Sequence, residues 1–142
     1  MDDWDNEGVV DRDTNRSSNA TCLWQKVLWA DGFLPASGVD GVFGDNTYKA
    51  TKAWQVYRNK AYEVGLAEDG SAGRATWGEA GYGAEGMGIY LTGSDAPGAT
   101  MTGNYIGRYA MFNMKRDADG NYQFIDGDGA WRKAGYDYRT CG

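Results

Sequence analysis

The chain has 142 residues, enough for one domain of ordinary size or two very small ones. Hydrophobic residues make up 42% of it and aromatic residues 14%, including six Trp and ten Tyr, which is too apolar a composition for a disordered chain. The net charge is −6, most of it lies in the first 18 residues, and no basic stripe follows. This charge pattern argues against a nucleic-acid binder, and no apolar run approaches the roughly 20 residues that a membrane span needs.

Three helices are predicted in the first part of the chain. Residues 1–18 are polar and charged, and we expect a flexible or loosely docked acidic tail there. Apolar residues at Leu23, Trp24, Val27 and Leu28 then predict an amphipathic helix over about 20–31. A second helix is expected over about 45–58 with Gly44 at its N-cap, and a short third one over about 74–79.

The loops before the second and third helices share one frame. "DGVFGDNT" at 40–47 returns as "DGSAGRAT" at 69–76, each reading Asp-Gly-x-x-Gly-x-x-Thr. Asp-Gly favours a tight turn, the second Gly admits an unusual entry into the helix, and Thr in the first turn can bond free backbone groups. The repeat therefore predicts two helix entrances.

Alternating patterns replace the helical ones after Gly81. Residues 105–116 alternate with period two, and the turn sequences "DADGN" and "DGDG" precede two further strand-like stretches. We expect an antiparallel meander of three strands, with 87–91 as a candidate fourth. The predicted fold class is α+β, with a tail at 1–18, a helical module at 19–82 and a β extension at 83–142 packed on it.

The two cysteines, Cys22 and Cys141, lie far apart in sequence, without metal-ligand spacing and in a chain without His. We favour a disulfide that ties the first helix to the last strand; two reduced, buried thiols are the alternative. A disulfide implies an oxidising compartment. Met1 is followed by acidic residues instead of a signal peptide, so we expect a secretory leader to have been removed.

The absence of His also excludes the Ser-His-Asp and Cys-His arrangements of nucleophilic enzymes. Paired carboxylates could still cleave a glycosidic bond, but Asp117, Asp119, Asp126 and Asp128 lie in turn sequences beside Gly, where Asp is expected for backbone reasons. "DADGN" and "DGDG" depart from the calcium-loop pattern. No catalytic residue, metal or cofactor is predicted.

Three stretches in order carry a recognisable set of residues: "LWQKVLWADGFL", "VDGVFGDNTYKATKAWQ" and "GLAEDGSAGRATW". The set consists of Gln25, Asp40, Gly41, Phe43, Gly44, Thr47, Trp54, Gln55, Gly70, Gly73, Thr76 and Trp77. Over about 20–80 the chain resembles the peptidoglycan-binding domain, a three-helix module of cell-wall hydrolases and secreted bacterial proteins. The β part resembles no module that we can assign.

This resemblance implies a secreted, extracellular or wall-associated protein that binds peptidoglycan, through its glycan or its stem peptide, without catalysis. The alternative is an adaptor or inhibitor that holds a protein partner on the same scaffold. A wall-cleaving enzyme with paired carboxylates is a weaker third hypothesis. Binding of nucleic acid is not expected, and the oligomeric state is open.

Within the module, we expect Trp24, Phe43 and Trp54 in the core and the amides of Gln25 and Gln55 buried against loop backbone. Four residues face less plainly inward on the helical wheel and are the candidates for a shallow ligand groove: Trp29, Tyr48, Tyr57 and Arg58. Ordinary surface or interdomain contact is the alternative for each of them. Aromatic and basic residues of the β part form a second candidate surface: Tyr105, Arg108, Tyr109, Trp131, Arg132, Lys133, Tyr136 and Tyr138. Because side chains alternate between the two faces of a strand, we expect half of them to be buried.

Overall fold

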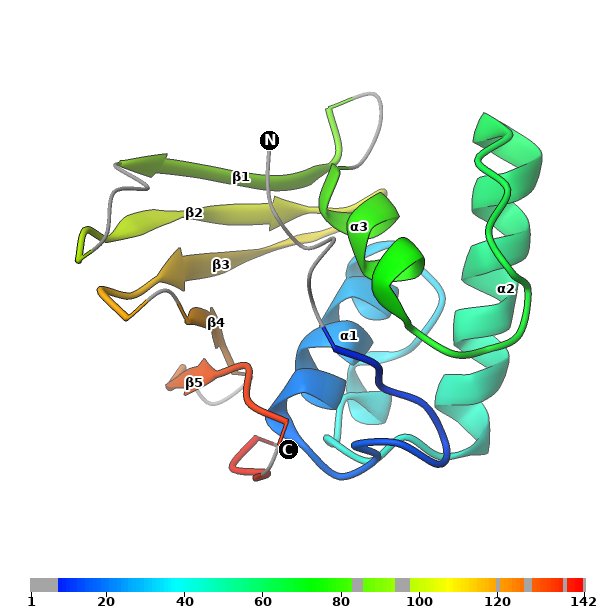
Figure 1. The fold of residues 1–142 in the computed structure, drawn as a ribbon, viewed down its shortest axis with the longest axis horizontal. Coiled ribbons are helices and arrows are strands. Elements are labelled where there is room, and N and C mark those ends of the chain that lie inside the picture. The colour runs from blue at the N-terminus through cyan, green and yellow to red at the C-terminus, as the bar shows by residue number, and fades with distance from the viewer. Residues whose placement is uncertain are drawn as a thin grey trace.

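The computed structural model describes residues 8–82, 86–93, 98–119, 121–126, 129–136 and 138–141. Within these ranges it has three α-helices and one five-stranded antiparallel sheet, which confirms the α+β class. Helix α1 (Asn19–Ala30) lies between the sheet and helix α2 (Asp45–Tyr62), and α3 (Arg74–Tyr82) packs near β1 (Figure 1). The sheet therefore covers the side of α1 that α2 leaves open.

The helices begin within one residue of their predicted starts; α1 also ends within one residue of its predicted end, whereas α2 and α3 continue further than predicted. Ser18 caps α1 through its hydroxyl, which accepts a hydrogen bond from the Thr21 N–H at 3.0 Å. Gly44 is the N-cap of α2 as expected. Helix α2 continues past Arg58 to Tyr62 and ends where Glu63 takes a positive φ of 55°. A short 3₁₀ helix, η2 (Ala36–Gly38), interrupts the connection between α1 and α2.

Three tryptophans, one from each α-helix, form the centre of the helical core. The ring of Trp24 meets those of Trp54 and Trp77 edge to face, with centroids 5.2 and 5.3 Å away. All three side chains and Phe43 are fully buried, which confirms the predicted core positions of Trp24, Phe43 and Trp54.

The sheet is a meander in which each strand pairs with the next one in the chain. Its strands are β1 (Gly88–Gly93), β2 (Met101–Ile106), β3 (Met111–Arg116), β4 (Tyr122–Ile125) and β5 (Trp131–Lys133). One face packs against the helices and shares their core, through Ile89, Leu91, Tyr105, Phe112, Met114, Tyr122 and Phe124. The sequence predicted three strands and a candidate fourth, so the meander is longer than expected.

The prediction of a single strand over 105–116 is wrong. This stretch forms the end of β2 and all of β3, joined by a four-residue turn at 107–110. The turn carries no Asp-Gly signal and is held in place by α1. The Ala30 carbonyl accepts hydrogen bonds from the Tyr109 and Ala110 N–H groups, at 2.9 and 3.1 Å. A side chain on Gly107 would collide with the same carbonyl, so only Gly fits there.

The described part of the predicted acidic tail, residues 8–18, is docked on the rest of the chain, which is the second of the two expected alternatives and corrects the expectation of a flexible tail there. Val10 is fully buried and bridges to Ala72, and Ser17 bridges to Val42. The Gly8 N–H also donates to the Tyr136 hydroxyl at 2.9 Å. Residues 1–7, which hold most of the acidic side chains of this segment, lie outside the described residues.

The C-terminal segment returns to the beginning of α1. Asn19 is fully buried, and its side-chain oxygen accepts hydrogen bonds from the Thr140 and Cys141 N–H groups at 2.7 and 3.0 Å. This places Cys141 against Cys22 in near contact, both as free, buried thiols. Closure of a disulfide between them stays a prediction.

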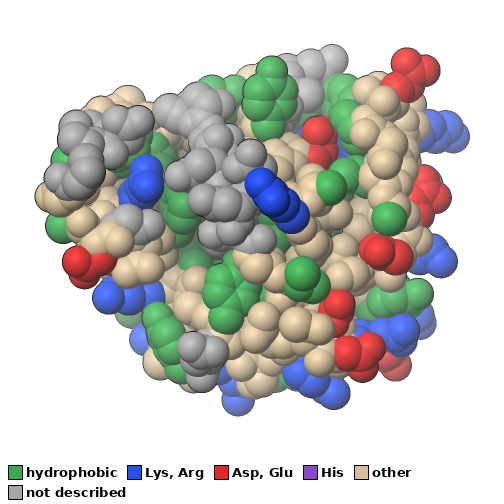
Figure 2. All heavy atoms as spheres, viewed as in Figure 1, with side chains coloured by type: hydrophobic (Ala, Val, Ile, Leu, Met, Phe, Trp, Pro, Cys, Tyr) green, Lys and Arg blue, Asp and Glu red, His purple; other side chains and the backbone are tan. Residues whose placement is uncertain are grey.

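Side chains of both charges share the molecular surface. On the face shown in Figure 2, acidic and basic groups gather together along the α2 edge.

None of the helices in the described part of the chain combines the length and hydropathy needed to cross a bilayer.

Candidate functional site

The first of the two repeated loops is built around the side chain of Gln25. Its amide oxygen accepts hydrogen bonds from the Asp40 and Gly41 N–H groups at 3.0 and 2.8 Å. Its NH₂ group donates to the Val42 carbonyl and the Thr47 hydroxyl, each at 3.0 Å, and to the Asp40 carboxylate at 3.1 Å. The predicted role of Gln25 as a buried bridge between loop groups is confirmed.

The second loop repeats this arrangement with Gln55. Its amide oxygen accepts from the Gly70 N–H at 2.9 Å, and its NH₂ group donates to the Ser71 carbonyl and the Thr76 hydroxyl at 2.9 and 3.1 Å. In both loops the aspartate also accepts a hydrogen bond from the N–H group two residues later. The shared sequence frame therefore encodes one loop design, in which a helix glutamine holds the entrance to the next helix.

A groove of about 620 Å³ opens beside the first of these loops. Its volume lies in the range of about 300–1,000 Å³ that is usual for ligand pockets. Residues of the α1–α2 connection form one side and the first half of α2 the other: Phe33, Leu34, Pro35, Ser37, Gly38, Asp40, Val42, Gly44, Asp45, Asn46, Thr47, Lys49, Ala50 and Ala53.

The groove combines an apolar base with a polar rim. Leu34 and Ala50 are buried among the groove residues, and Leu34 packs closely on Gly38 of η2. Asn46 and Lys49 project from the exposed side of α2. An occupant of this groove would therefore meet apolar surface below it, and an amide and an ammonium group beside it.

The structure does not gather the four predicted ligand residues, and none of them lines this groove. Trp29 is half-buried against the core and has the Lys26 ammonium 5.3 Å from its ring. The guanidinium carbon of Arg12, on the N-terminal segment, lies over the Tyr48 ring, 3.7 Å from its centroid. Arg58 is fully buried, which corrects its expected place on a surface groove. Tyr57 is half-buried next to Phe33, with ring centroids 5.7 Å apart.

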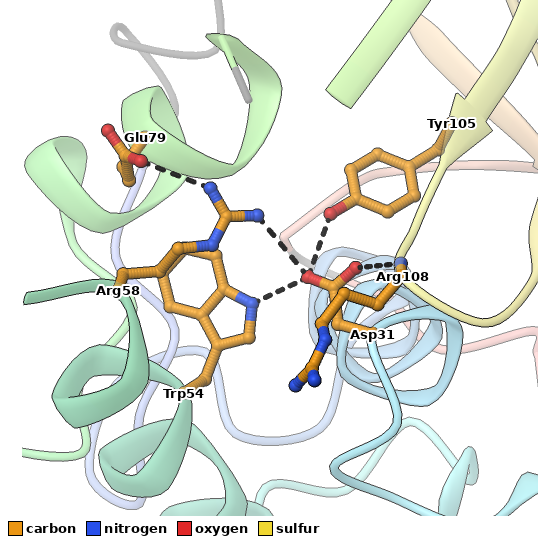
Figure 3. A network of polar contacts seen from close by, with 6 residues as sticks. All are labelled: Asp31, Trp54, Arg58, Glu79, Tyr105 and Arg108. Atoms are coloured by element: carbon orange, nitrogen blue, oxygen red, sulfur yellow. Dashed lines mark hydrogen bonds and ion pairs between the residues drawn. The ribbon is translucent and has the colours of Figure 1, made fainter. Parts of the chain in front are cut away.

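Arg58 belongs to a buried polar network between the helices and the sheet (Figure 3). Its guanidinium forms ion pairs with Glu79 at 3.0 Å and with Asp31 at 3.6 Å. The Asp31 carboxylate also accepts hydrogen bonds from the Trp54 indole at 2.6 Å and the Tyr105 hydroxyl at 3.1 Å. Burial raises the pKa of Tyr105 well above its ordinary value, and the Asp31 charge adds to this.

Sequence reasoning did not single out Asp31, although a signal was present. Asp31 is the C-cap of α1, where a negative charge opposes the helix dipole. A charge in such an unfavourable local position indicates a tertiary partner, here Arg58 on the inward face of α2. The groove residues Asn46 and Lys49 had no comparable signal, because polar side chains on an exposed helix face are ordinary.

The pKa values of two side chains on α1 are shifted, those of Cys22 and Lys26. When both cysteines are reduced, the hydrogen bond with Cys141 and burial raise the pKa of the Cys22 thiol. Burial lowers the pKa of Lys26, whose ammonium donates to the Ile125 carbonyl at 2.9 Å. Both groups lie under the sheet and not in the groove.

The turn aspartate Asp117 accepts hydrogen bonds from the Asp119 and Asn121 N–H groups of its own turn, as its sequence context predicted.

No protein family, curated protein or solved structure matches this chain. The candidate site is therefore defined by its own geometry.

Proposed function

We propose that this protein is a secreted, non-catalytic binding protein of bacterial cell-wall peptidoglycan, and that the groove beside α2 holds the stem peptide. The observation that carries the proposal is this groove, whose wall is the loop held by Gln25. The loop belongs to the part of the chain whose residues resemble the peptidoglycan-binding domain. A preorganised loop that borders a groove of ligand size favours binding over a purely structural role.

The chemistry of the groove suits a short peptide with small apolar side chains and free carboxylates. Leu34, Pro35 and Ala50 offer apolar surface to methyl groups. Lys49 can pair with a carboxylate, and the Asn46 amide can bond peptide groups. A bare glycan would make less use of the apolar base, so we favour the stem peptide.

The groove carboxylates support binding without catalysis. Asp40 is engaged by the Gln25 amide and by the Val42 N–H group, at 3.1 and 3.0 Å. Asp45 lies 3.4 Å from the Arg12 guanidinium, with its side chain 80% exposed. Both carboxylates thus already have partners within the protein, the loop for Asp40 and Arg12 for Asp45.

The test is co-sedimentation of the oxidised protein with purified peptidoglycan sacculi. Ala53→Trp fills the groove from an exposed position on α2 and should lower retention about tenfold or more. Ala75→Trp, which adds the same side chain at an exposed position of α3 outside the groove, is the matched control and should bind normally. Analysis of the supernatant for released wall fragments tests the absence of catalysis.

Two outcomes would contradict the proposal. If the native chain does not pellet with sacculi, wall binding is wrong and the protein-adaptor hypothesis replaces it. If the native chain pellets but Ala53→Trp and Ala75→Trp are retained equally well, the wall is bound elsewhere on the molecule. Release of soluble fragments by the native chain would replace binding with hydrolysis.

A further inference from the structure

An exposed arginine lies at the turn between β2 and β3, outside the three-helix part. The guanidinium carbon of Arg108 is 4.6 Å from the ring centroid of Tyr57, on α2, and 4.9 Å from that of Tyr109. Cation–π contacts with two rings restrict the guanidinium without using its N–H donors. No carboxylate or carbonyl in the described residues accepts a hydrogen bond from this guanidinium, so its donors face solvent.

The turn that carries Arg108 is fixed by buried groups at the end of α1. The Arg108 N–H donates to the Asp31 carboxylate at 3.2 Å, and its side chain leads away from that carboxylate (Figure 3). The Ala30 carbonyl holds the next two N–H groups of the turn. The Tyr109 ring packs directly on Gly32, where a Cβ atom would collide with it. The side chain is therefore presented by a rigid turn, although the turn itself is on the surface.

Aromatic contacts connect Arg108 with the groove. Phe33 lines the groove and also contacts the ring of Tyr57, with centroids 5.7 Å apart. Tyr57 in turn lies against the Arg108 guanidinium. These contacts lead from the groove, through the half-buried rings of Phe33 and Tyr57, to Arg108 at the end of the sheet. A ligand longer than the groove can reach the arginine along them.

We propose that Arg108 is a ligand-binding residue that receives a carboxylate of the peptide lying in the groove. A guanidinium binds a carboxylate with two parallel hydrogen bonds, and the contacts with two aromatic rings restrict where this guanidinium lies. The exposed Arg108 guanidinium has no carboxylate partner among the described residues, so its charge is available to an anionic ligand. The inference rests on the proposed function. It gives the β extension a role in recognition.

The test compares two preparations of the same sacculi, one with its carboxylates intact and one with them converted to neutral amides by carbodiimide coupling. Arg108→Gln removes the charge but keeps the backbone N–H that donates to Asp31. Lys133→Gln, at an exposed position of β5, removes an equal charge elsewhere and is the matched control. Arg108→Lys keeps the charge and loses the fork. Thermal unfolding establishes that each variant is folded.

With intact sacculi, we expect Arg108→Gln to bind about tenfold more weakly than the native chain and Arg108→Lys to lie between them. Amidation should weaken the native chain and Lys133→Gln by a similar factor, and should leave Arg108→Gln almost unchanged. If Arg108→Gln and the native chain lose affinity equally on amidation, Arg108 does not receive the carboxylate, whereas wall binding stands. If the native chain does not bind intact sacculi, the proposed function fails and this inference with it.

Discussion

The buried ion pair between Asp31 and Arg58 makes a quantitative prediction about stability. Asp31 is 1% exposed and Arg58 is fully buried, so neither charge is solvated by water. Removing one member of a buried pair costs about 3–5 kcal/mol, because the other charge stays behind without compensation. We expect about 3 kcal/mol for Asp31→Asn, at the low end, since Glu79 still pairs with Arg58. A loss of this size is a large fraction of the stability of an ordinary domain.

The double variant separates the ion pair from its surroundings. Arg58→Met alone leaves Asp31 with hydrogen-bond donors from Trp54 and Tyr105 but without a cation, and should also cost about 3 kcal/mol. In the double variant, Asp31→Asn with Arg58→Met, no buried charge is left unpaired at these two sites. Its loss should therefore be smaller than the sum of the two single losses by at least about 1 kcal/mol.

The measurement is urea unfolding of the four proteins, followed by Trp fluorescence and circular dichroism, with the free energy of unfolding and its urea dependence fitted together. Glu79→Gln serves as a control, because the side chain of Glu79 is 14% exposed and retains more hydration. The reasoning is refuted if Asp31→Asn stays within about 0.5 kcal/mol of the native chain, or if the two single losses add fully in the double variant.

Three further predictions concern the loops, the sheet and the cysteines. Gln25→Leu and Gln55→Leu should each cost about 3 kcal/mol in urea unfolding, because loop N–H and C=O groups lose their partners. Only the Gln25 variant should also lose sacculus binding. Tyr105→Phe should be about 1 kcal/mol less stable near pH 8, where the native hydroxyl is bonded. Since the pKa of Tyr105 is raised on folding, the native chain should lose stability as pH rises above about 10, and the variant less so. Reduction of Cys22 and Cys141 in air-oxidised protein should lower the free energy of unfolding by roughly 5 kcal/mol, as for a loop of more than 100 residues.

Each of these three has its own contrary result. Equal loss of sacculus binding in the two glutamine variants would contradict the assignment of the groove to the first loop. A parallel decline of native and Tyr105→Phe urea midpoints between pH 9 and 11 would contradict the raised pKa. For the cysteines, two titratable thiols per chain after air oxidation would show that the pair stays reduced, and Cys141→Ser would then be no less stable than the native chain under reducing conditions.

The helices could be predicted from sequence because their signals are local. Leu23, Trp24, Val27 and Leu28 recur at helical spacing, and all are fully buried in the structure. The two Asp-Gly loops precede helices because turn formation and helix entry depend on a few neighbouring residues. The end of α2 was less predictable: the segment after Arg58 contains good helix formers, and only the positive φ of Glu63 ends it.

The sheet was harder to predict because its turn between β2 and β3 depends on a distant helix. Alternation continues through Gly107 and Ala110, so the pattern by itself favours one long strand. The chain reverses there because the Ala30 carbonyl takes two N–H groups of the turn and leaves no room for a side chain at Gly107. Such a contact joins residues more than 70 positions apart and has no local signature.

For the candidate site, sequence patterns predicted the supporting residues better than the exposed ones. Gln25 and Gln55 precede the Asp of their repeated loops by 15 and 14 residues, so a similar bonding role could be inferred for both. Trp29, Tyr48 and Arg58 were placed by a helical wheel, which cannot show that a sheet or an N-terminal segment covers one side of a helix. Arg58 is covered in this way, and it is an interior ion-pair partner instead of a surface contact.

The same covering explains why the helical part and the sheet depend on one another. Asp31 carries a full charge at the end of α1, and its hydrogen-bond donors come from both parts: Trp54 from α2, and the Tyr105 hydroxyl and the Arg108 N–H from the sheet. Without the sheet, Asp31 would lose two of these donors and the inner side of α1 would be exposed. With the sheet in place, the bond from Asp31 to the Arg108 backbone fixes the turn on the outside. The carboxylate that stabilises the interior thus also determines where the Arg108 side chain leaves the turn.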